Sequence, residues 1–513
     1  MSKAFAGALL CSTVFLVAAP AEAQKAQDTL RVAYKVPIST TDIYYDPQPE
    51  MALTSAAVFD MLVAFDAKTK TLRPSLAESW KQVTPTVIEM KLREGIKFHD
   101  GSPFTADDVV YTLTYITDPK SNLRSTALWS FIEKVEKIDD HNVRITTKSP
   151  TPYALARLAA ATPIFPKAVH SRLENKADFG RRTPIGTGPY KVVSVDASSG
   201  IKLVRNDDYK PAGSWNARAR IKNVHLLPMP DPQTQIAQLL TGGIDIILES
   251  PKDQSEQLTT MPNITSTAVG NTVYTYMLFD AAGRSGVEPL TKPEVRRALA
   301  MAVDRPLLAK AIMAGGDMVK VVDAPCSPAA QVGCVATPIK FKHDPKAARD
   351  LLAKAGYPNG FDVQITTLTG AEKLGEAIAG QLRAIGVRAS MDHTTFVAFR
   401  TKQTAGKFQI LVAHYSSGGT SDVNSVLQTY LENESRDYWR DKELAKLATA
   451  SAIEMDPKQR DDLLRQTFDM MNDKTLLLPL TTFPAVLVHT TDLVLPQVST
   501  IFTGPEFNNI AWK

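Results

Sequence analysis

The feature that most constrains the fold is a repeated order of strand, helix and strand signals. Residues 221–227 predict a strand, Asp231-Pro232 marks the start of a helix, and the apolar run 244–248 predicts the next strand. A second unit lies at residues 361–387, where the predicted helix carries the apolar face Leu374, Ile378, Leu382 and Ile385. This order predicts an α/β protein built on substantial sheets.

Two further helices are predicted from their end signals. Thr291-Lys292-Pro293-Glu294 has the pattern of a capping box, which predicts a helix running through Val303. Asp344-Pro345 predicts the start of another helix, and Gly356 predicts its end.

Length and composition limit the class of protein. The chain has 513 residues, so at roughly 150 residues per domain about three domains are expected. Hydrophobic residues make up 44% and charged residues 22%, as in ordinary globular proteins. The net charge of +4 is small for this length and gives no basic surface for nucleic acid or an anionic membrane. We therefore expect no nucleic-acid partner.

The N-terminus has the pattern of a secretory signal peptide. Lys3 precedes an apolar stretch at 4–19, and Ala21 and Ala23 fit the small-residue rule for cleavage after Ala23. The alternative is a membrane anchor, but the stretch is shorter than the roughly 20 residues that span a bilayer. The sequence thus predicts an exported, soluble protein whose signal peptide is residues 1–23.

The mature chain has two cysteines, Cys326 and Cys334. Export to an oxidising compartment predicts that they form a disulfide. The alternative is a metal site that also uses His343, but two thiols and one distant imidazole lack the paired spacing of zinc sites. No metal and no cofactor are predicted.

Motifs of known enzymes are missing from the sequence. It has no G-x-S-x-G and no H-E-x-x-H, and Gly186-Thr187-Gly188 lacks the third glycine and the strand-to-helix context of a dinucleotide loop. His99-Asp100-Gly101 and residues 139–142 resemble acid/base clusters, but each lies between strand-like runs and has the composition of a hairpin turn. The sequence therefore predicts no catalytic residues.

One long segment and several shorter ones match a known family in the same order. The long segment is Leu92 to Tyr111, LREGIKFHDGSPFTADDVVY, whose local pattern is a strand, an Asp-Gly turn and a helix opened by a Thr105/Asp108 capping box. The shorter segments are 72–80, 184–190, 205–209, 295–299 with 304–305, and 344–358. Together they closely resemble the family 5 extracellular solute-binding proteins, the dipeptide, oligopeptide and nickel receptors of bacterial ABC importers.

The resemblance implies a two-lobed α/β fold of the periplasmic-binding-protein type, with mixed sheets and a hinge of two crossing segments. It implies a first lobe at 24–268 with an extra subdomain at roughly 48–185, a second lobe at 269–486, and a return to the first lobe at 487–513. We expect the crossings near Thr267 to Tyr274 and Leu480 to Val488.

The resemblance also implies a function without catalysis. A small solute, with a di- or oligopeptide favoured, would bind between the lobes and shift them toward a closed form. The closed protein, expected to be a periplasmic monomer, would deliver the solute to ABC permease subunits in the inner membrane. The alternatives are the same architecture with a non-peptide solute (a nickel complex, an opine, a sugar or another small molecule) or, from a different class, a secreted hydrolase.

The family's amine-pairing aspartate, which bears on the identity of the ligand, is not matched in this chain. The corresponding segment here is 413–422, in which Gly419 takes that position and Asp422 is the only acid. Asp280 also departs from a common family asparagine. Either carboxylate could pair with a ligand amine from a shifted position, so a peptide is favoured only narrowly.

Candidate ligand contacts come from two segments and one helix. Tyrosine offers a flat apolar face with one polar group, which suits a pocket for varied ligands. Arg400 could pair with a ligand carboxylate, although an exposed surface arginine is the commoner case. For Tyr44 and Tyr45 ordinary packing is an equal alternative, and Tyr274 and Tyr276 are expected in the core. The predicted contacts are Tyr44, Tyr45, Arg400, His414, Tyr415, Ser416, Ser417 and Asp422.

Overall fold

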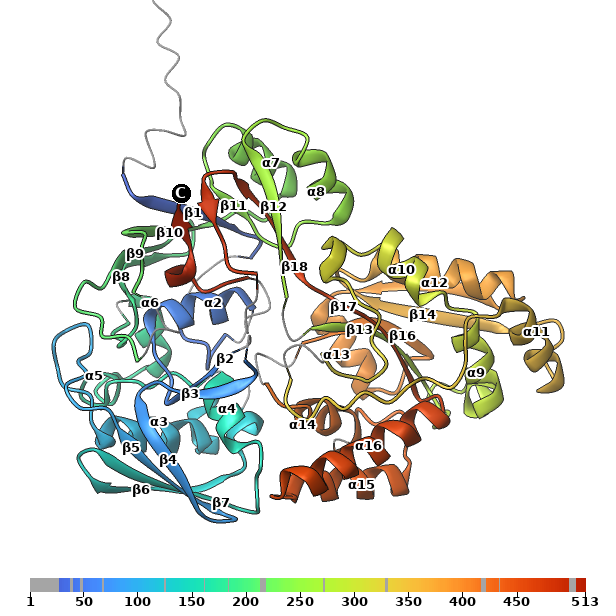
Figure 1. Cartoon of the computed structure of the whole chain (residues 1–513), viewed down its shortest axis with the longest axis horizontal. Helices are drawn as coiled ribbons and strands as arrows, with labels where there is room; N and C mark the ends of the chain where they lie inside the picture. Colours follow the sequence, from blue (N-terminus) through green and yellow to red (C-terminus); the bar gives the residue numbers. More distant parts are fainter. Residues whose placement is uncertain are drawn as a thin grey trace, which may run out of the picture.

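In the computed structural model the chain forms two lobes, each built around its own mixed sheet (Figure 1). The predicted α/β fold is therefore confirmed. The predicted signal peptide lies outside the described residues, and within them no helix is long and apolar enough to cross a membrane. The structure describes residues 27–36, 40–46, 49–66, 69–123, 126–160, 162–182, 184–212, 218–270, 273–327, 331–416, 421–432, 434–497 and 504–513.

The sheet of lobe I has seven strands in the order β12-β18-β11-β1-β10-β9-β8. β1 lies at its centre, parallel to β10 and β11, and its Leu30, Val32 and Tyr34 are fully buried. Such burial explains the near-continuous apolar run of this strand. The strands are β1 (Thr29–Tyr34), β8 (Tyr190–Asp196), β9 (Gly200–Arg205), β10 (Asn223–Pro228), β11 (Ile246–Ile247), β12 (Ile264–Val269) and β18 (Ala485–Thr490).

The first predicted strand-helix-strand unit is confirmed as β10, α7 (Pro232–Leu240) and β11. The carboxylate of Asp231 accepts the backbone N–H of Thr234 at 2.8 Å. Pro232 at the start of the helix has no backbone N–H, so no hydrogen-bond acceptor is needed there. Both strands pair with β1 in parallel, so α7 connects the two strands that flank β1. The next helix of this lobe is α8 (Lys252–Leu258).

A separate antiparallel sheet, in the order β4-β5-β7-β6, lies beside the main sheet of lobe I (Figure 1). Thr105 and Asp108 form the predicted capping box of α3, and Gly101 has a φ of 87° in the predicted turn. The elements are α2 (Pro49–Val58), β2 (Val63–Asp66), β3 (Thr71–Pro74), β4 (Ala77–Thr84), β5 (Val87–Leu92), α3 (Ala106–Thr117), β6 (Ile132–Asp139), β7 (Asn142–Thr147), α4 (Ala154–Ala160), α5 (Lys167–His170) and α6 (Phe179–Arg182).

The two segments that resemble acid/base clusters, residues 99–101 and 139–142, form turns, as predicted. His99 bridges to the Gly186–Gly188 segment, with its Nε2 3.0 Å from the Gly188 carbonyl oxygen and its Nδ1 accepting the Gly186 N–H at 3.2 Å. Asp139 accepts the backbone N–H of His141 at 2.9 Å between β6 and β7. Both clusters thus fasten loops.

The sheet of lobe II has five strands in the order β15-β14-β16-β13-β17. β14 runs parallel to β15 and β16, whereas β13 runs antiparallel to β16 and β17. The elements are β13 (Tyr274–Phe279), α9 (Pro293–Met301), α10 (Arg305–Ala311), α11 (Pro345–Lys354), β14 (Asp362–Leu368), α12 (Glu372–Ala384), β15 (Arg388–Thr394), α13 (Phe396–Thr404), β16 (Ile410–Tyr415), α14 (Asn424–Leu427), the π-helical turn η6 (Gln428–Glu432), α15 (Lys442–Ile453), α16 (Pro457–Asp473) and β17 (Leu477–Thr482).

The second strand-helix-strand unit is confirmed as β14, α12 and β15, and the apolar face of α12 is buried in the lobe II core. Asp344 caps α11 as predicted, accepting the N–H of Ala347 at 2.8 Å. The capping box predicted at Thr291 is wrong. Lys292 is the N-cap of α9, and the Thr291 hydroxyl instead donates to the Glu288 carbonyl at 2.8 Å in the preceding 3₁₀ turn.

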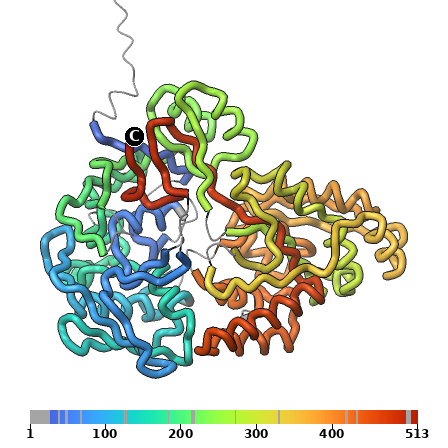
Figure 2. Tube along the Cα trace, in the orientation of Figure 1, coloured from blue at the N-terminus to red at the C-terminus, as the bar shows by residue number. Residues whose placement is uncertain are grey.

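Two neighbouring segments carry the chain between the sheets (Figure 2). The first runs from Val269 at the end of β12 to Tyr274 at the start of β13, and the second from Thr482 to Ala485 at the start of β18. Val269 pairs with Ala485 in the lobe I sheet. Beyond β18, β19 (Leu493–Val494) pairs with β20 (Ala511–Trp512) in lobe I.

Candidate functional site

The carboxyl ends of four lobe II strands define the candidate site. β14, β15, β16 and β17 run in one direction and end at the same edge, and antiparallel β13 begins there with Tyr274. Both crossing segments join lobe II at this edge, so it faces lobe I. In open α/β sheets ligands bind outside the carboxyl ends of the strands. We call this the carboxyl edge of lobe II.

Five rings from β13, β16, η6 and the turn after it pack together at this edge, and we call them the aromatic cluster. Neighbouring ring centroids are 5.7 to 6.1 Å apart. The Tyr430 hydroxyl donates to the Tyr276 hydroxyl at 2.5 Å. Tyr274 and Tyr276 are buried, as predicted. The members are Tyr274, Tyr276, Tyr415, Tyr430 and Trp439.

Two N–H or O–H groups of the cluster are buried without a hydrogen-bond partner among the described residues. They are the Tyr274 hydroxyl and the Trp439 Nε1. A buried polar group without a partner loses its hydration, and in native proteins such a group calls for an explanation. Tyr415, predicted as a ligand contact, is 9% exposed, and its hydroxyl lies 3.3 Å from the Thr429 Oγ1.

His414 connects the carboxyl edge to a crossing segment. Its ring stacks on that of Phe483, with centroids 5.3 Å apart and an interplanar angle of 9°. Burial lowers the pKa of His414 to about 4, so the imidazole is neutral at neutral pH. Ser416 is exposed immediately after β16, and Ser417 lies outside the described residues.

Arg400 lies half-buried on α13, the helix that follows the end of β15 at the carboxyl edge. Its guanidinium carbon is 5.0 Å from the ring centre of Phe396 and 5.6 Å from that of Phe399. Its Nη1 donates to the side chain of Gln403 at 2.8 Å, and it has no ion pair with a described residue. Phe396 and the adjacent Val397 are 57% and 77% exposed, which gives α13 an open apolar end beside this cation.

Asp422 differs from the expectation of a ligand contact, because its carboxylate is used inside the lobe. Arg460 of α16 donates to both of its oxygens, at 2.9 and 2.7 Å. The side chains of Asp422 and Arg460 are only 2% and 7% exposed. Asp280 is likewise internal, since its oxygens accept the backbone N–H groups of Arg284 and Ser285. These two carboxylates hold loops.

Tyr44 and Tyr45 lie in lobe I, and the structure favours the packing alternative for Tyr44. Its side chain is 1% exposed, its hydroxyl donates to the Pro163 carbonyl at 2.7 Å, and its ring packs edge-on against Trp129 and Phe165. Tyr45 is less buried, and its hydroxyl lies 2.5 Å from that of Tyr115.

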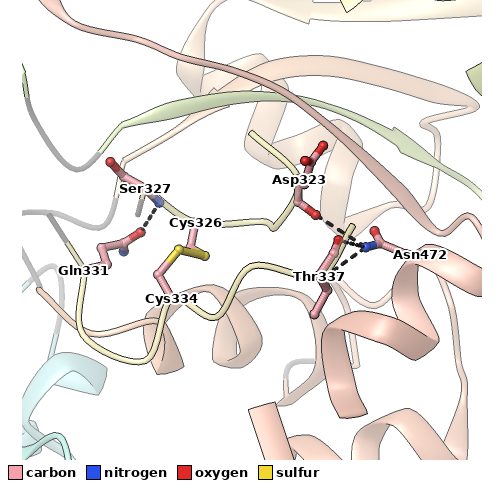
Figure 3. Close-up of a disulfide and its surroundings, with 7 residues drawn as sticks. All are labelled: Asp323, Cys326, Ser327, Gln331, Cys334, Thr337 and Asn472. Atoms are coloured by element: carbon pink, nitrogen blue, oxygen red, sulfur yellow. Dashed lines mark hydrogen bonds between the residues drawn. A yellow bond between two sulfur atoms is a disulfide. The ribbon is translucent and has the colours of Figure 1, made fainter. Parts of the chain in front are cut away.

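Cys326 and Cys334 form a disulfide, as the sequence predicts (Figure 3). The loop that it closes is fixed by hydrogen bonds, including one of 2.8 Å from the Ser327 N–H to the Gln331 side chain. Val332 in this loop bonds to the Ser421 carbonyl at 2.6 Å and accepts the Val423 N–H at 3.1 Å. The disulfide loop thus supports the segment that contains Asp422.

At the facing edge of lobe I, Lys35 and Glu249 follow the carboxyl ends of β1 and β11. The Lys35 ammonium donates to the Glu249 carbonyl at 2.9 Å, and the Glu249 Oε1 is buried without a hydrogen-bond partner in the described part of the chain. Burial raises the pKa of Glu249 to about 7, with Lys35 opposing and Glu50 adding to the rise.

Polar contacts between described residues join the lobes at three places. The Gln428 amide, in η6, accepts from the Arg157 Nη2 of α4 at 2.6 Å and donates to the Tyr153 hydroxyl at 3.1 Å. Lys373 of α12 pairs with Asp253 of α8 at 2.9 Å. The Lys252 ammonium donates to the Lys310 carbonyl at 2.5 Å.

Several site residues were missed by sequence reasoning. Gln428 gave no signal because its partners lie far away in the sequence. Glu249 gave none because the sequence does not show that one of its carboxylate oxygens is buried without a partner in the described part of the chain. The aromatic residues near Tyr430 could have been found, since Tyr430, Tyr438 and Trp439 fall within ten residues in a chain with 7% aromatic residues.

Comparison with known proteins points to one family. Residues 71–438 match the family described as "Bacterial extracellular solute-binding proteins, family 5 Middle". The glutathione-binding protein GsiB of Escherichia coli K12 is 30% identical over 357 residues, which are 68% of this chain and 66% of that protein. The match therefore spans slightly less than two thirds of that relative's length.

Solved structures show the same fold. CtaP of Listeria monocytogenes has a TM-score of 0.81 at 21% identity, covering 94% of this chain and 99% of that one. A dipeptide-binding protein of Pseudoalteromonas in complex with Met-Leu has a TM-score of 0.78 at 21% identity, covering 94% and 100%. AgaA of A. tumefaciens in complex with agropinic acid has a TM-score of 0.74 at 24% identity, covering 94% and 99%.

Proposed function

Because the chain belongs to the bacterial extracellular solute-binding proteins of family 5, we propose that it is the substrate-binding component of an ABC importer. It would act in the periplasm after cleavage behind Ala23, capture a small solute, and deliver it to permease subunits of the inner membrane. The observation that carries this proposal is the family match over residues 71–438, on a fold whose two sheets are joined by two adjacent segments.

Hinge closure is the mechanism that this arrangement supports. A solute at the carboxyl edge of lobe II touches lobe I only when the lobes approach, so it binds the closed form better and shifts the population toward it. Contacts such as that between Gln428 and Arg157 are available to stabilise the closed form. This mechanism requires binding and release, and no bond of the solute is broken.

We propose the following lobe boundaries. Lobe I comprises 24–268 and 487–513, with an extra subdomain at roughly 48–185, and lobe II comprises 269–486. The change of sheet between Val269 and Tyr274 supports the first boundary. Because β18 already starts at Ala485, the second boundary is better drawn at Pro484.

The proposed solute is a peptide or a peptide-like molecule. Relatives and structural neighbours are named for glutathione, for a Met-Leu dipeptide, for agropinic acid and for a nickel–histidine complex. The proposed contacts are those at or near the carboxyl edge of lobe II. They are Arg400, His414, Tyr415 and Ser416. Ser417, which follows in the sequence, lies outside the described residues and stays a proposed contact from the sequence alone.

The test is mass spectrometry of solutes released by denaturing the full mature protein after purification from the periplasm. We expect one small solute per protein molecule, and re-addition of that solute should raise the melting temperature without any product appearing. A protein that carries no solute and is not stabilised by dipeptides, glutathione or opines would contradict the receptor role. Product formation from the recovered solute would instead indicate an enzyme.

A further inference from the structure

The disulfide loop of lobe II is fixed at its neck by a side chain of α16. The Asn472 amide donates to the Asp323 carbonyl at 3.3 Å and to the Thr337 carbonyl at 2.8 Å, so one residue ties the two ends of the loop together (Figure 3). The bond between Cys326 and Cys334 closes the loop inside this neck. The loop thus has one cross-link of hydrogen bonds and one that is covalent, and a reductant breaks the covalent one.

The far part of the loop is bonded to the segment that precedes α14. The Val332 N–H donates to the Ser421 carbonyl at 2.6 Å, and the Val423 N–H donates to the Val332 carbonyl at 3.1 Å. Gly333 has a φ of 72°, and a Cβ placed on it would lie 2.9 Å from the Leu464 side chain of α16. The loop therefore fits closely between α16 and this segment, so a change in the shape of the loop is passed on to the segment.

The segment bonded to the loop starts the element that meets lobe I. The Asp422 carboxylate accepts the Asn424 N–H at 2.8 Å and so fixes the start of α14, which continues directly into η6. In η6 the Gln428 side chain is bonded to Arg157 and Tyr153 of lobe I at 2.6 and 3.1 Å. A continuous series of contacts thus leads from the disulfide loop to the other lobe.

The same π-helical turn also reaches the candidate site. Tyr430 donates to the Tyr276 hydroxyl at 2.5 Å within the aromatic cluster, and the Thr429 Oγ1 lies 3.3 Å from the Tyr415 hydroxyl. Such turns are rare and occur frequently at functional sites. Because η6 contacts lobe I with one side chain and the aromatic cluster with the next two, a shift of η6 acts on closure and on the site together.

We propose that the disulfide of Cys326 and Cys334 is a redox-sensitive switch of solute binding. The oxidised loop holds α14 and η6 in place, whereas reduction releases them, so the lobes open more readily and the solute leaves faster. This inference rests on the proposed receptor function and adds regulation to the same site. The physical basis is that the bond and the solute act on one two-state element, the open and closed lobes.

Reduction begins at Cys334, because Cys334 is partly exposed whereas Cys326 is fully buried. A thiolate of a dithiol attacks the Cys334 Sγ, the S–S bond breaks, and Cys326 leaves as a thiolate and takes up a proton. The second thiolate of the dithiol then attacks the mixed disulfide and releases Cys334, which also takes up a proton. Two electrons and two protons pass to the loop, which ends with two thiols, while the dithiol becomes a disulfide.

The test measures one protein in two redox states. The full mature wild type is purified oxidised from the periplasm with the solute that it carries, and is studied before and after reduction with dithiothreitol. Loss of this solute during dialysis is followed by mass spectrometry, and amide hydrogen exchange is followed in residues 424–431. We expect reduction to speed up solute loss about tenfold, within the usual range of coupling between sites, and to speed up the exchange.

The matched control is the double variant Cys326→Ser/Cys334→Ser. It should lose solute and exchange amides like the reduced wild type, and dithiothreitol should change neither rate. Unchanged solute loss or unchanged exchange at 424–431 after reduction of the wild type would overturn the inference. A double variant that holds the solute as well as the oxidised wild type does would overturn it too.

A second control separates the switch from a general loss of stability. Leu382→Ala removes a buried side chain of α12 from a core cluster that does not contain Cys326. It should lower the melting temperature but leave solute loss and exchange at 424–431 as in the oxidised wild type. Solute loss as fast as in the reduced wild type would count against the switch. A wild type that carries no solute would contradict the receptor function itself, and the exchange rates would still decide whether the disulfide holds α14 and η6.

Discussion

Asp422 offers the sharpest test of the difference between a ligand contact and a structural ion pair. In the structure both of its oxygens accept hydrogen bonds from Arg460, and both side chains are almost fully buried. Asp422→Ala leaves the Arg460 guanidinium buried with one remaining hydrogen bond, from its Nε to the Ser451 carbonyl at 3.1 Å. The substitution should therefore lower the stability of lobe II rather than remove a contact with the solute.

The expected size follows from this burial. Removing one partner of a buried ion pair costs about 3–5 kcal/mol. A domain of the size of lobe II loses roughly 2–4 °C in melting temperature per kcal/mol, so a fall of roughly 10 °C is expected. Replacing both residues, with Asp422→Leu and Arg460→Met, should recover most of the loss because no charge is left unpaired.

Differential scanning calorimetry of the solute-free protein measures the effect. Asp462→Ala is the control, because this exposed carboxylate lies on the same helix as Arg460 and should change the melting temperature little. An Asp422→Ala protein that melts like the wild type but no longer holds its solute would refute the structural interpretation. Asp422 would then be a ligand contact, as the sequence suggested.

Three further predictions concern pH, the disulfide and closure. Burial raises the pKa of Asp42 to about 7, so stability should fall by up to about 4 kcal/mol as pH rises from 4 to 8; Asp42→Asn should flatten this dependence in urea unfolding at the two pH values. Replacing Cys326 and Cys334 by serine should cost roughly 2–3 kcal/mol, and a reductant should destabilise only the wild type. Gln428→Ala removes two contacts between the lobes, so the distance between spin labels attached at Lys134→Cys and Lys346→Cys should increase. In the control Gln428→Glu this distance should stay as in the wild type, because the glutamate keeps the pairing with Arg157.

Local patterns predicted the elements well where neighbouring residues determine them. Asp231 and Asp344 cap their helices because the capping hydrogen bond spans only three residues. The Thr291 box failed for a reason that is also local. The Thr291 hydroxyl bonds backward to Glu288, in a 3₁₀ turn that the pattern did not reveal.

The roles of polar and aromatic side chains were harder to predict, because they depend on distant residues. In the sequence Asp422 has the pattern of an exposed loop carboxylate, but in the structure it forms an ion pair with Arg460, 38 residues later. The sequence suggests that Tyr44 contacts the ligand, but in the structure its ring packs against Trp129 and Phe165. Glu249 gave no signal at all, because the sequence does not show that one of its carboxylate oxygens is buried without a partner among the described residues.

The contacts at the carboxyl edge of lobe II suggest why binding and closure would be coupled. His414 stacks on Phe483, and the Phe483 N–H donates to the Val273 carbonyl at 3.0 Å, so one side chain of the proposed site rests on both crossing segments. A solute that orders this edge therefore acts directly on the segments that must bend. A ligand shifts the lobes only by its difference in affinity for the two forms, and a shift from 1:99 to 99:1 needs about 5.5 kcal/mol. A charge-assisted hydrogen bond contributes roughly 1.5–3 kcal/mol, so a solute must gain about two of the strongest or four of the weakest such bonds only in the closed form.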